Sequence, residues 1–292
     1  KKSAESEQVL WTTCECKNLI YKEDLEKNYN CCPKCGAHHK LSCKERFQIF
    51  FDNKEYELIE TPQPKDDPLN FVDNKKYIDR LKSARKITKQ EDAVAIATGT
   101  VENIQVTVGA QDFRFIGGSF GAASGEAFIH GVQHAIENKN PFIFYSCSGG
   151  QRLMESGIAL LQMSRTVLAV NELKKNNIPF IVVMTNPTTG GVTASWASLG
   201  DILIAEPKAT IGFAGKRVIQ DTVRESLPEE FQTAEYLREH GQIDLVIERQ
   251  FLRSTISTLL TVLLKKTETK ANNDSSNVVT LDNSLQKSSK AL

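Results

Sequence analysis

Short hydrophobic runs alternate with amphipathic segments along the chain from about residue 92 to residue 265. Short apolar runs are typical of buried strands, and a period near 3.6 residues is typical of helices, so the alternation indicates an α/β fold. We expect strands at 93–98, 104–109, 112–116, 141–147, 178–185, 201–206 and 243–247. We expect helices at 122–138, 151–176, 192–199, 217–226, 232–240 and 250–265.

The segment 151–176 shows the helical period best. One face of this predicted helix carries Leu153, Gly157, Leu160, Leu161, Ser164 and Leu168. Polar residues at 174–177 and then Pro179 mark its end. The helix would join the apolar runs on either side of it as parallel strands, through a right-handed crossover.

Those two apolar runs, PFIFYSC and PFIVVMTN, both lead into a glycine pair and then a helical pattern. The pairs are Gly149–Gly150 and Gly190–Gly191. Parallel neighbours would bring both turns to one edge of the sheet, where an amide from each could converge on a single oxygen. Such an oxyanion hole suits the enolate of a thioester. The alternative is that both pairs only start helices in an ordinary α/β protein.

Common phosphate-binding and hydrolytic motifs are missing around these turns. There is no GxxxxGK[ST], the glycines of IGGSFGAASGE do not fit GxGxxG, and SCSGG does not fit GxSxG. His130 and His134 lie one helical turn apart without a third ligand, so we expect a helix-face role for them. We expect Arg152 and Glu155 to pair and hold the first turn rigid. No protein base is evident, so the base would come from a substrate.

Five of the seven cysteines lie between Cys14 and Cys35, which favours a metal module in a reducing compartment over a disulfide scaffold. The candidate ligands of a closed, structural zinc site are Cys14, Cys16, Cys32 and Cys35. The first pair is CxC, one residue shorter than the usual knuckle. Cys31, His38 and His39 therefore stay open as substitute ligands.

Composition narrows the class of protein. The chain of 292 residues has 36 basic and 36 acidic side chains and a formal net charge of zero, which gives no general attraction to nucleic acid or anionic lipid. No apolar run is long enough to cross a membrane, and KKSAESEQVLW lacks the apolar segment of a secretory signal. The polar C-terminal tail has too few large apolar residues to form a core.

Several segments resemble a known family. SGGQRLMESGIALLQM resembles carboxyltransferases that act on acyl-CoA, and residues 188–247 resemble the β subunits of bacterial and plastid acetyl-CoA carboxylase carboxyltransferase. FIGGSFGAASGE and WTTCECKNLIY…CCPKCGAHHKLS are similar to that family's glycine-rich stretch and N-terminal zinc ribbon. We therefore expect a flexible N-terminus at 1–8, a zinc ribbon at 9–45, a crotonase-like ββα-superhelix domain at 46–266 and a disordered tail at 267–292.

The resemblance implies transfer of a carboxyl group from carboxybiotin, held on a biotin carboxyl carrier protein, to acetyl-CoA. The product would be malonyl-CoA, in the first step of fatty acid synthesis, and ATP would be used elsewhere in the complex. This chain would bind acetyl-CoA, and an α subunit would complete the site in an α2β2 heterotetramer. Biotin's ureido nitrogen would take the acetyl proton, which accounts for the missing base. The location would be the cytoplasm or the plastid stroma.

The resemblance also implies site residues. The oxyanion hole would use the amides of Gly149, Gly150, Gly190 and Gly191. The acetyl-CoA site or its support would include Gly117, Gly118, Arg152, Gly212 and Gly215. The sequence departs from the family at the CEC knuckle, at Gln151 where the family has Ala, and at Leu153–Met154 where it has Met–Gln.

Two other functions stay open. A crotonase-type hydratase or isomerase would use the same oxyanion hole with Glu155 as its base. A zinc ribbon could instead bind nucleic acid through its lysines, although nearby acidic residues offset much of their charge. Binding that weakens steeply with salt would support the second alternative.

Overall fold

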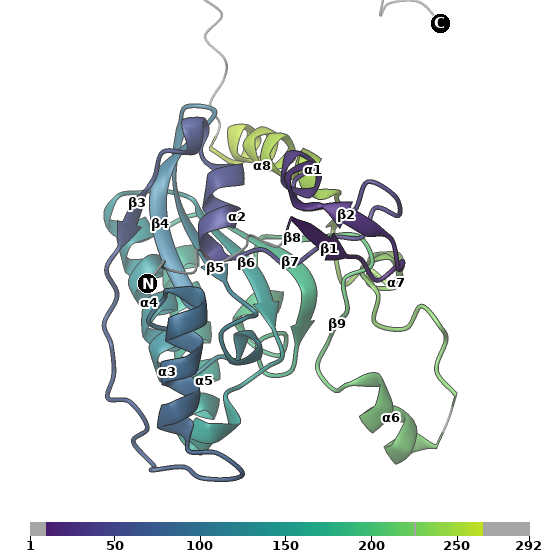
Figure 1. Cartoon of the computed structure of the whole chain (residues 1–292). Helices are drawn as coiled ribbons and strands as arrows, with labels where there is room; N and C mark the ends of the chain where they lie inside the picture. Colours follow the sequence, from purple (N-terminus) through teal and green to yellow (C-terminus); the bar gives the residue numbers. More distant parts are fainter. Residues whose placement is uncertain (1–9, 225, 265–292) are drawn as a thin grey trace, which may run out of the picture.

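The computed structural model describes residues 10–224 and 226–264 (Figure 1). Its centre is an eight-stranded sheet with the order β10-β8-β7-β6-β5-β4-β3, and β9 pairs with the end of β7. The strands of this sheet are β3 (Glu57–Ile59), β4 (Val94–Val101), β5 (Ile104–Gln111), β6 (Phe142–Ser148), β7 (Phe180–Thr189), β8 (Ile202–Ala205), β9 (Ile211–Gly212) and β10 (Leu245–Val246). From β5 to β10 neighbours are parallel, and β3 and β4 extend the sheet antiparallel.

Helices cover both faces of the sheet. The helices are α1 (Lys22–Lys27), α2 (Cys43–Phe50), α3 (Tyr77–Thr88), α4 (Ala122–Glu137), α5 (Ser156–Lys175), α6 (Lys216–Val223), α7 (Ala234–Glu239) and α8 (Arg249–Leu263). In β6, Phe142 and Phe144 join the core formed with α4 and α5, while Ile143 and Tyr145 join the core formed with α2 and α8. Burial on both faces explains why this strand is a continuous apolar run.

A small N-terminal module precedes the sheet. It contains the hairpin of β1 (Trp11–Thr13) and β2 (Leu19–Tyr21), followed by α1. Figure 1 shows this module beside α8, and it shows α6 projecting away from the rest of the fold. Among residues 10–224 and 226–264, no helix has both the length and the apolar character that a membrane crossing requires.

The expected pairing of the two glycine-terminated strands is confirmed. Strands β6 and β7 are parallel, with Ser146 beside Met184, and after a shift in register Ser148 lies beside Thr188. Helix α5 forms the crossover between them. Both glycine turns therefore leave the sheet at the same edge.

Three predicted elements are wrong in part. Residues 112–116 form a turn, because Asp112 accepts a hydrogen bond from the amide of Arg114 (2.9 Å) and closes an Asx turn there. Residues 192–199 form turns with only a short 3-10 segment, since the hydroxyl of Ser195 bonds the carbonyl of Gly191 (2.6 Å) in place of a regular helix contact. The helix expected from 151 begins at Ser156, after a 3-10 turn at Leu153–Glu155.

Helices α2 and α3 were not predicted. Helix α2 carries a readable start signal, because Ser42 and Glu45 form a capping box: the Ser42 hydroxyl accepts the Glu45 amide, and the Glu45 carboxylate accepts the Ser42 amide (2.7 Å). Helix α3 packs through Tyr77 and Leu81.

The leucine face of the helix predicted at 151–176 is exposed in this chain. Its leucines are Leu153, Leu160, Leu161 and Leu168, which are 76%, 59%, 64% and 65% exposed. The buried face of α5 instead presents small and polar residues in its first half and two larger apolar ones near its end: Ala159, Gln162, Thr166, Ala169, Val170 and Leu173. The period of the helix was read correctly, but the most apolar face is not the one that packs on the sheet. The tails expected at 1–8 and 267–292 lie outside the described residues.

Candidate functional site

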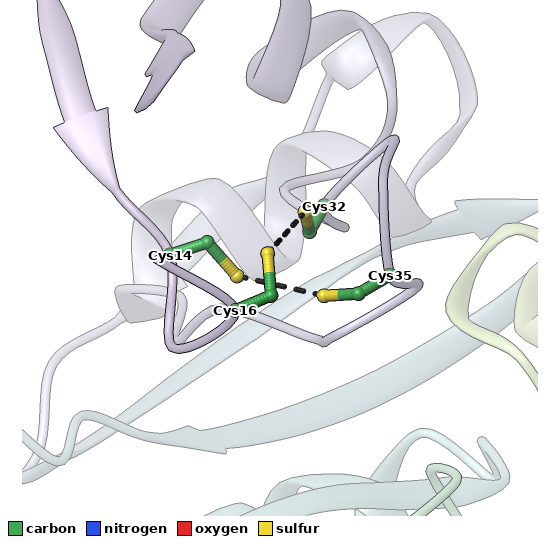
Figure 2. A group of neighbouring side chains, drawn as sticks. All are labelled: Cys14, Cys16, Cys32 and Cys35. Atoms are coloured by element: carbon green, nitrogen blue, oxygen red, sulfur yellow. Dashed lines mark hydrogen bonds between the residues drawn. The ribbon is translucent and has the colours of Figure 1, made fainter. Parts of the chain in front are cut away.

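The four predicted zinc ligands come together in the N-terminal module (Figure 2). Sγ of Cys14 lies 3.6 Å from Sγ of Cys35, and Sγ of Cys16 lies 3.9 Å from Sγ of Cys32. All four sulfurs lie within 4.8 Å of one another. A tetrahedral zinc with bonds of about 2.3 Å sets its sulfurs about 3.8 Å apart, so the cluster fits this metal and leaves no coordination position open.

The short CxC knuckle still delivers both sulfurs. Its turn closes through the Lys17 amide to the Cys14 carbonyl (2.8 Å) and the Cys14 amide to the Asn18 carbonyl (3.0 Å), with Lys17 in the left-handed region (φ 64°). The side-chain amide of Asn18 donates to Sγ of Cys16 (3.3 Å) and lowers the pKa of this thiol to about 6. Cys16 is thus prepared as a thiolate, the form that binds zinc.

The substitute ligands left open by the sequence point elsewhere. Sγ of Cys31 lies 3.7 Å from the carbonyl of Tyr29, and Cys31 forms a backbone bridge with His38. Nδ1 of His38 lies 3.3 Å from the carboxylate of Glu206, across the boundary with the large domain. In the described part of the chain, the cysteine cluster contains neither Cys31 nor a histidine.

Glu206, at the end of β8, is a buried anion at the centre of a cationic cluster. It is 1% exposed and accepts hydrogen bonds from Arg46 of α2 (2.8 Å) and from Arg249 of α8 (2.8 and 2.7 Å), with His38 alongside. Burial alone would raise the pKa of Glu206, but the two guanidinium groups hold it well below its ordinary value. The negative charge of Glu206 neutralises the positive charges of Arg46 and Arg249, whose burial without a partner would destabilise the fold.

Arg249 also links the N-terminal module to the large domain. Nη1 of Arg249 donates to the carbonyl oxygens of Tyr29 (3.0 Å) and His39 (2.9 Å). A cavity of about 830 Å³ lies between the module and the large domain, a size typical of small-molecule sites. Its lining includes Cys14, His39, Lys40, Asn186, Lys208 and Arg249.

The two glycine turns touch each other. A Cβ added at Gly190 would lie 2.9 Å from Cα of Gly150, and both residues have positive φ (67° and 114°). A side chain at Gly190 would therefore strain the backbone and push the turns apart. The contact brings the predicted oxyanion-hole residues from β6 and β7 to one place.

Two of the four glycine amides are used to shape the turns. The amide of Gly149 donates to the carbonyl of Gly117 (2.9 Å), and the amide of Gly190 donates to the carbonyl of Gly212 (3.0 Å). Gly118 is also part of this frame, because a Cβ there would meet the carbonyl oxygen of Cys147 at 2.0 Å. The glycine-rich loop and β9 thus support the first and second turn respectively.

The other two amides, those of Gly150 and Gly191, differ from these in their hydrogen-bond partners. The amide of Gly150 donates to the hydroxyl of Ser148 (3.0 Å), which in turn donates to the carbonyl of Gly118 (2.7 Å). The amide of Gly191 has no hydrogen-bond acceptor within residues 10–224 and 226–264. It opens a single helical turn closed by the Ala194 amide on the Gly190 carbonyl (3.1 Å), and first-turn amides point outward. A Cβ built on Gly150 would lie 3.7 Å from the Gly191 nitrogen, so the two amides are neighbours.

Arg152 lies behind the first turn and is 1% exposed. Its guanidinium forms a two-pronged pair with Asp92 (2.6 and 2.8 Å) and donates to the carbonyl of Ser119 (2.6 Å) and the hydroxyl of Tyr77 (3.2 Å). The expected contact with Glu155 is present at 3.4 Å, although Asp92 is the principal partner. Burial lowers the pKa of Arg152, but Asp92 more than offsets this and raises it. Arg152 therefore supports the site from behind and has no surface for a substrate.

Glu155 is similarly committed to the frame. Its carboxylate accepts hydrogen bonds from the amide of Ala122 at the start of α4 (2.6 Å) and from the hydroxyl of Tyr77 (2.6 Å). The approach is close enough that a Cβ at Gly121 would lie 2.6 Å from the carboxylate oxygens. A carboxylate that is 5% exposed and held in this way is not placed to act as a general base.

The remaining predicted residues divide between the turn and its surroundings. Gly212 lies in β9 beside Thr189, directly next to the second turn. Gly215 precedes α6, on the segment that projects from the fold, and a Cβ there would meet nothing within 4 Å. His134 takes the helix-face role expected for it, with Nδ1 3.0 Å from the Thr107 hydroxyl.

Sequence reasoning missed Asp92, Tyr77 and Glu206. A buried arginine requires a buried anion, so the placement of Arg152 beside a glycine turn signals that a partner carboxylate exists. It does not say which one, because Asp92 lies 60 residues away in the chain. Glu206 is still more remote from Arg46, at a separation of 160 residues.

Comparison with known proteins gives two family matches. Residues 70–290 match the carboxyl transferase domain, and residues 11–35 match the acetyl-CoA carboxylase zinc finger domain. Curated relatives named acetyl-coenzyme A carboxylase carboxyl transferase subunit beta cover most of the chain. The protein of Pelagibacter ubique is 55% identical over 88% of this chain and 82% of its own length. The protein of Brucella abortus (strain 2308) is 50% identical over 85% of this chain and 82% of its own length.

Solved structures share the fold at low identity. The transcarboxylase 12S structure with methylmalonyl-coenzyme A and methylmalonic acid bound has a TM-score of 0.65 at 22% identity. The match covers 82% of this chain and 43% of the transcarboxylase chain. A Pseudomonas malonate decarboxylase hetero-dimer has a TM-score of 0.59 at 18% identity, over 76% of this chain and 86% of the other.

Proposed function

The chain belongs to the family of acetyl-CoA carboxylase carboxyl transferase beta subunits, and from this premise we propose how its site works. The reaction is the transfer of a carboxyl group from carboxybiotin to acetyl-CoA to give malonyl-CoA. The fold is the carboxyltransferase α/β fold, preceded by a zinc ribbon. The observation that carries the proposed mechanism is the contact between the two glycine turns, with the Gly191 amide unengaged.

We propose that two of the four predicted amides, one from each turn, form the oxyanion hole. Gly191 and Gly150 supply the N–H groups that receive the thioester oxygen, while Gly149 and Gly190 hold the turns in place. Negative charge grows on that oxygen when the acetyl α-proton leaves, so the two donors bind the enolate more strongly than the thioester. Loss of one such donor costs about 3 kcal/mol of transition-state stabilisation.

The proton acceptor and the CO2 are supplied by carboxybiotin, which a partner carries. Within residues 10–224 and 226–264, no carboxylate or histidine side chain forms a hydrogen bond with the two glycine pairs, and Glu155 is engaged with Ala122 and Tyr77. This speaks against the hydratase or isomerase alternative, which needs a base from this polypeptide. The task of the chain is to bind the acyl-CoA and to hold its oxygen.

The chain functions within the acetyl-CoA carboxylase complex. We propose that its direct partner is the α subunit, in an α2β2 assembly that also receives the biotin carboxyl carrier protein. The exposed leucine face of α5 supports this, because an apolar stripe rimmed by polar residues is typical of a subunit interface. Leu153, in the 3-10 turn before α5, is also exposed and lies three residues after Gly150, so a partner covering it would reach the glycine turns. In line with the bacterial relatives, we place the complex in the cytoplasm.

The zinc ribbon has a structural zinc held by Cys14, Cys16, Cys32 and Cys35. With four thiolates the metal has no position for a substrate, so it takes no part in the chemistry. The ribbon instead forms one wall of the cavity whose lining includes Asn186, four residues before Gly190 in the chain. We propose that this cavity is part of the route by which acetyl-CoA approaches.

The test is the reverse reaction, in which malonyl-CoA gives acetyl-CoA in the presence of a biotin derivative. The chain alone, the α partner alone and their mixture are compared, and zinc content and heteromer formation are measured in the same samples. Activity in the mixture alone is the expected result. A zinc-loaded heteromer without activity would refute the proposal.

A further inference from the structure

Gln151 has a buried side-chain amide whose polar atoms are not satisfied by the protein. Neither Nε2 nor Oε1 is exposed, and neither has a hydrogen-bond partner among the residues that the structure describes. The backbone of Gln151 is fixed, because the flanking Gly150 carbonyl and Arg152 amide both bond Phe120 (2.9 and 3.0 Å). The backbone at Gln151 is therefore held in place, while the side-chain amide is left without a partner among the described residues.

This amide lies at the second glycine turn. A Cβ built on Gly191 would lie 2.6 Å from Cγ and 2.9 Å from Nε2 of Gln151. Gln151 thus comes from the first turn and reaches across to the second. Its Nε2 lies beside the residue whose backbone N–H is also unengaged.

A buried amide without hydrogen bonds destabilises a protein, and natural structures retain few of them. Buried polar groups that the fold does not satisfy are instead common where a ligand supplies the missing partner. An apolar residue of the same size would fill this space without the penalty. The placement next to two glycine amides indicates that the ligand offers an oxygen there.

We propose that Gln151 is a catalytic residue: its Nε2 donates a hydrogen bond to the acyl oxygen of the CoA thioester, together with the Gly191 amide. The inference rests on the proposed function, because it needs an acyl oxygen at the glycine turns. Gln151 then adds a side-chain donor to an oxyanion hole that otherwise consists of backbone. The bond strengthens as the oxygen becomes an enolate, so it acts mainly on kcat.

The test uses the zinc-loaded complex with the α partner and compares Gln151→Leu, Gln151→Glu and a control, Gln162→Leu. Gln162 is also buried, but its amide is satisfied: Nε2 donates to the Ile158 carbonyl (3.0 Å) and Oε1 accepts from Arg165 (3.0 Å). Malonyl-CoA decarboxylation gives kcat and KM, and thermal unfolding without CoA ligands gives Tm.

The expected result separates stability from catalysis. Gln151→Leu keeps or raises Tm and lowers kcat by about 100-fold with little change in KM, since one donor of an oxyanion hole is lost. Gln151→Glu, of equal size but without the donor when ionised, lowers kcat at least as much. Gln162→Leu lowers Tm and leaves kcat within about threefold.

Three outcomes would overturn the inference. Unchanged kcat in Gln151→Leu, with an active wild-type complex, would remove the role of Gln151 alone. A joint fall of Tm and kcat that matches Gln162→Leu would make Gln151 a structural residue. An inactive wild-type complex would refute the proposed function, and the role of Gln151 with it.

Discussion

The buried pair of Arg152 and Asp92 should be among the most costly in the protein to break. Asp92→Ala leaves the Arg152 guanidinium with the weaker contact to Glu155 (3.4 Å), in a place where its side chain is 0% exposed. Removing one partner of a buried ion pair typically costs 3–5 kcal/mol, because the other charge is left uncompensated. Since Glu155 and the Ser119 carbonyl remain, we expect a loss of about 3 kcal/mol.

The chain provides a matched control in the pair of Arg85 and Asp66. This pair has the same two-pronged geometry, with distances of 2.6 and 2.8 Å, but its side chains are 28% and 36% exposed. Water screens such a pair, so Asp66→Ala should cost less than about 1 kcal/mol.

Urea denaturation of each zinc-loaded variant gives the free energy of unfolding. The same variants are assayed for malonyl-CoA decarboxylation in the complex, because Arg152 holds the loop that carries Gly117 and the turn that carries Gly150. Asp92→Ala should lose activity at temperatures where it is still folded. Equal losses of stability for the two aspartates would contradict the reasoning, because burial would then not decide the cost of breaking the pair.

Three further predictions follow from single features. Gly190→Ala should lower kcat at least tenfold, since its Cβ would lie 2.9 Å from Cα of Gly150. The control Gly241→Ala has a similar φ (72°) but open space around its Cβ, so its kinetics should be unchanged. Steady-state assays of both variants test this prediction. Cys32→Ser should lose the zinc and the adjacent Cys31→Ser should keep it; zinc retained in both would contradict the ligand set. Glu206→Gln should be less stable than the wild type at neutral pH. The pKa of Glu206 is lower in the folded state than its unfolded value of about 4.3, so the carboxylate stabilises the fold at pH values above about 4.3. The difference in urea midpoint between wild type and Glu206→Gln should therefore shrink as the pH falls below this value.

The sequence predicted the parallel centre of the fold because each strand there is buried on both faces. The run 142–148 is buried at every position and mostly apolar, and the glycine pair that ends it is equally visible. The zinc site was also visible, since cysteine spacing indicates a metal module, although the short CEC knuckle left Cys31, His38 and His39 open as substitute ligands. These features are local, and each depends on residues that are close together in the chain.

The sequence could not predict which face of α5 is buried. Its most apolar face carries Leu160, Leu161 and Leu168 and is exposed, while Gln162 and Thr166 pack inward. A chain whose apolar surface serves a partner as well as its own core presents two candidate faces, and periodicity alone does not choose between them. The same limit applies to Asp92 and Glu206, whose partners are set by tertiary structure.

Gln151 shows a different limit. As a letter in the sequence it is only a departure from the alanine of the resembling family. Its meaning depends on the position of Gly191, 40 residues later, and on the absence of any acceptor or donor for its amide among the described residues.

The hydrogen bonds from Arg249 to the ribbon also predict the order in which parts of the protein fold. All four zinc ligands are present once Cys35 has been made, so the ribbon can take its metal early. The arginine that holds it is 220 residues away from the Tyr29 carbonyl and 210 from that of His39, and lies at the start of the last helix. Contacts of such long range form late, because the intervening chain must first be ordered. The ribbon should therefore fold independently and pack against the sheet last. In pulse proteolysis during refolding, the segment between Cys35 and α2 should become protected only after α8 has packed.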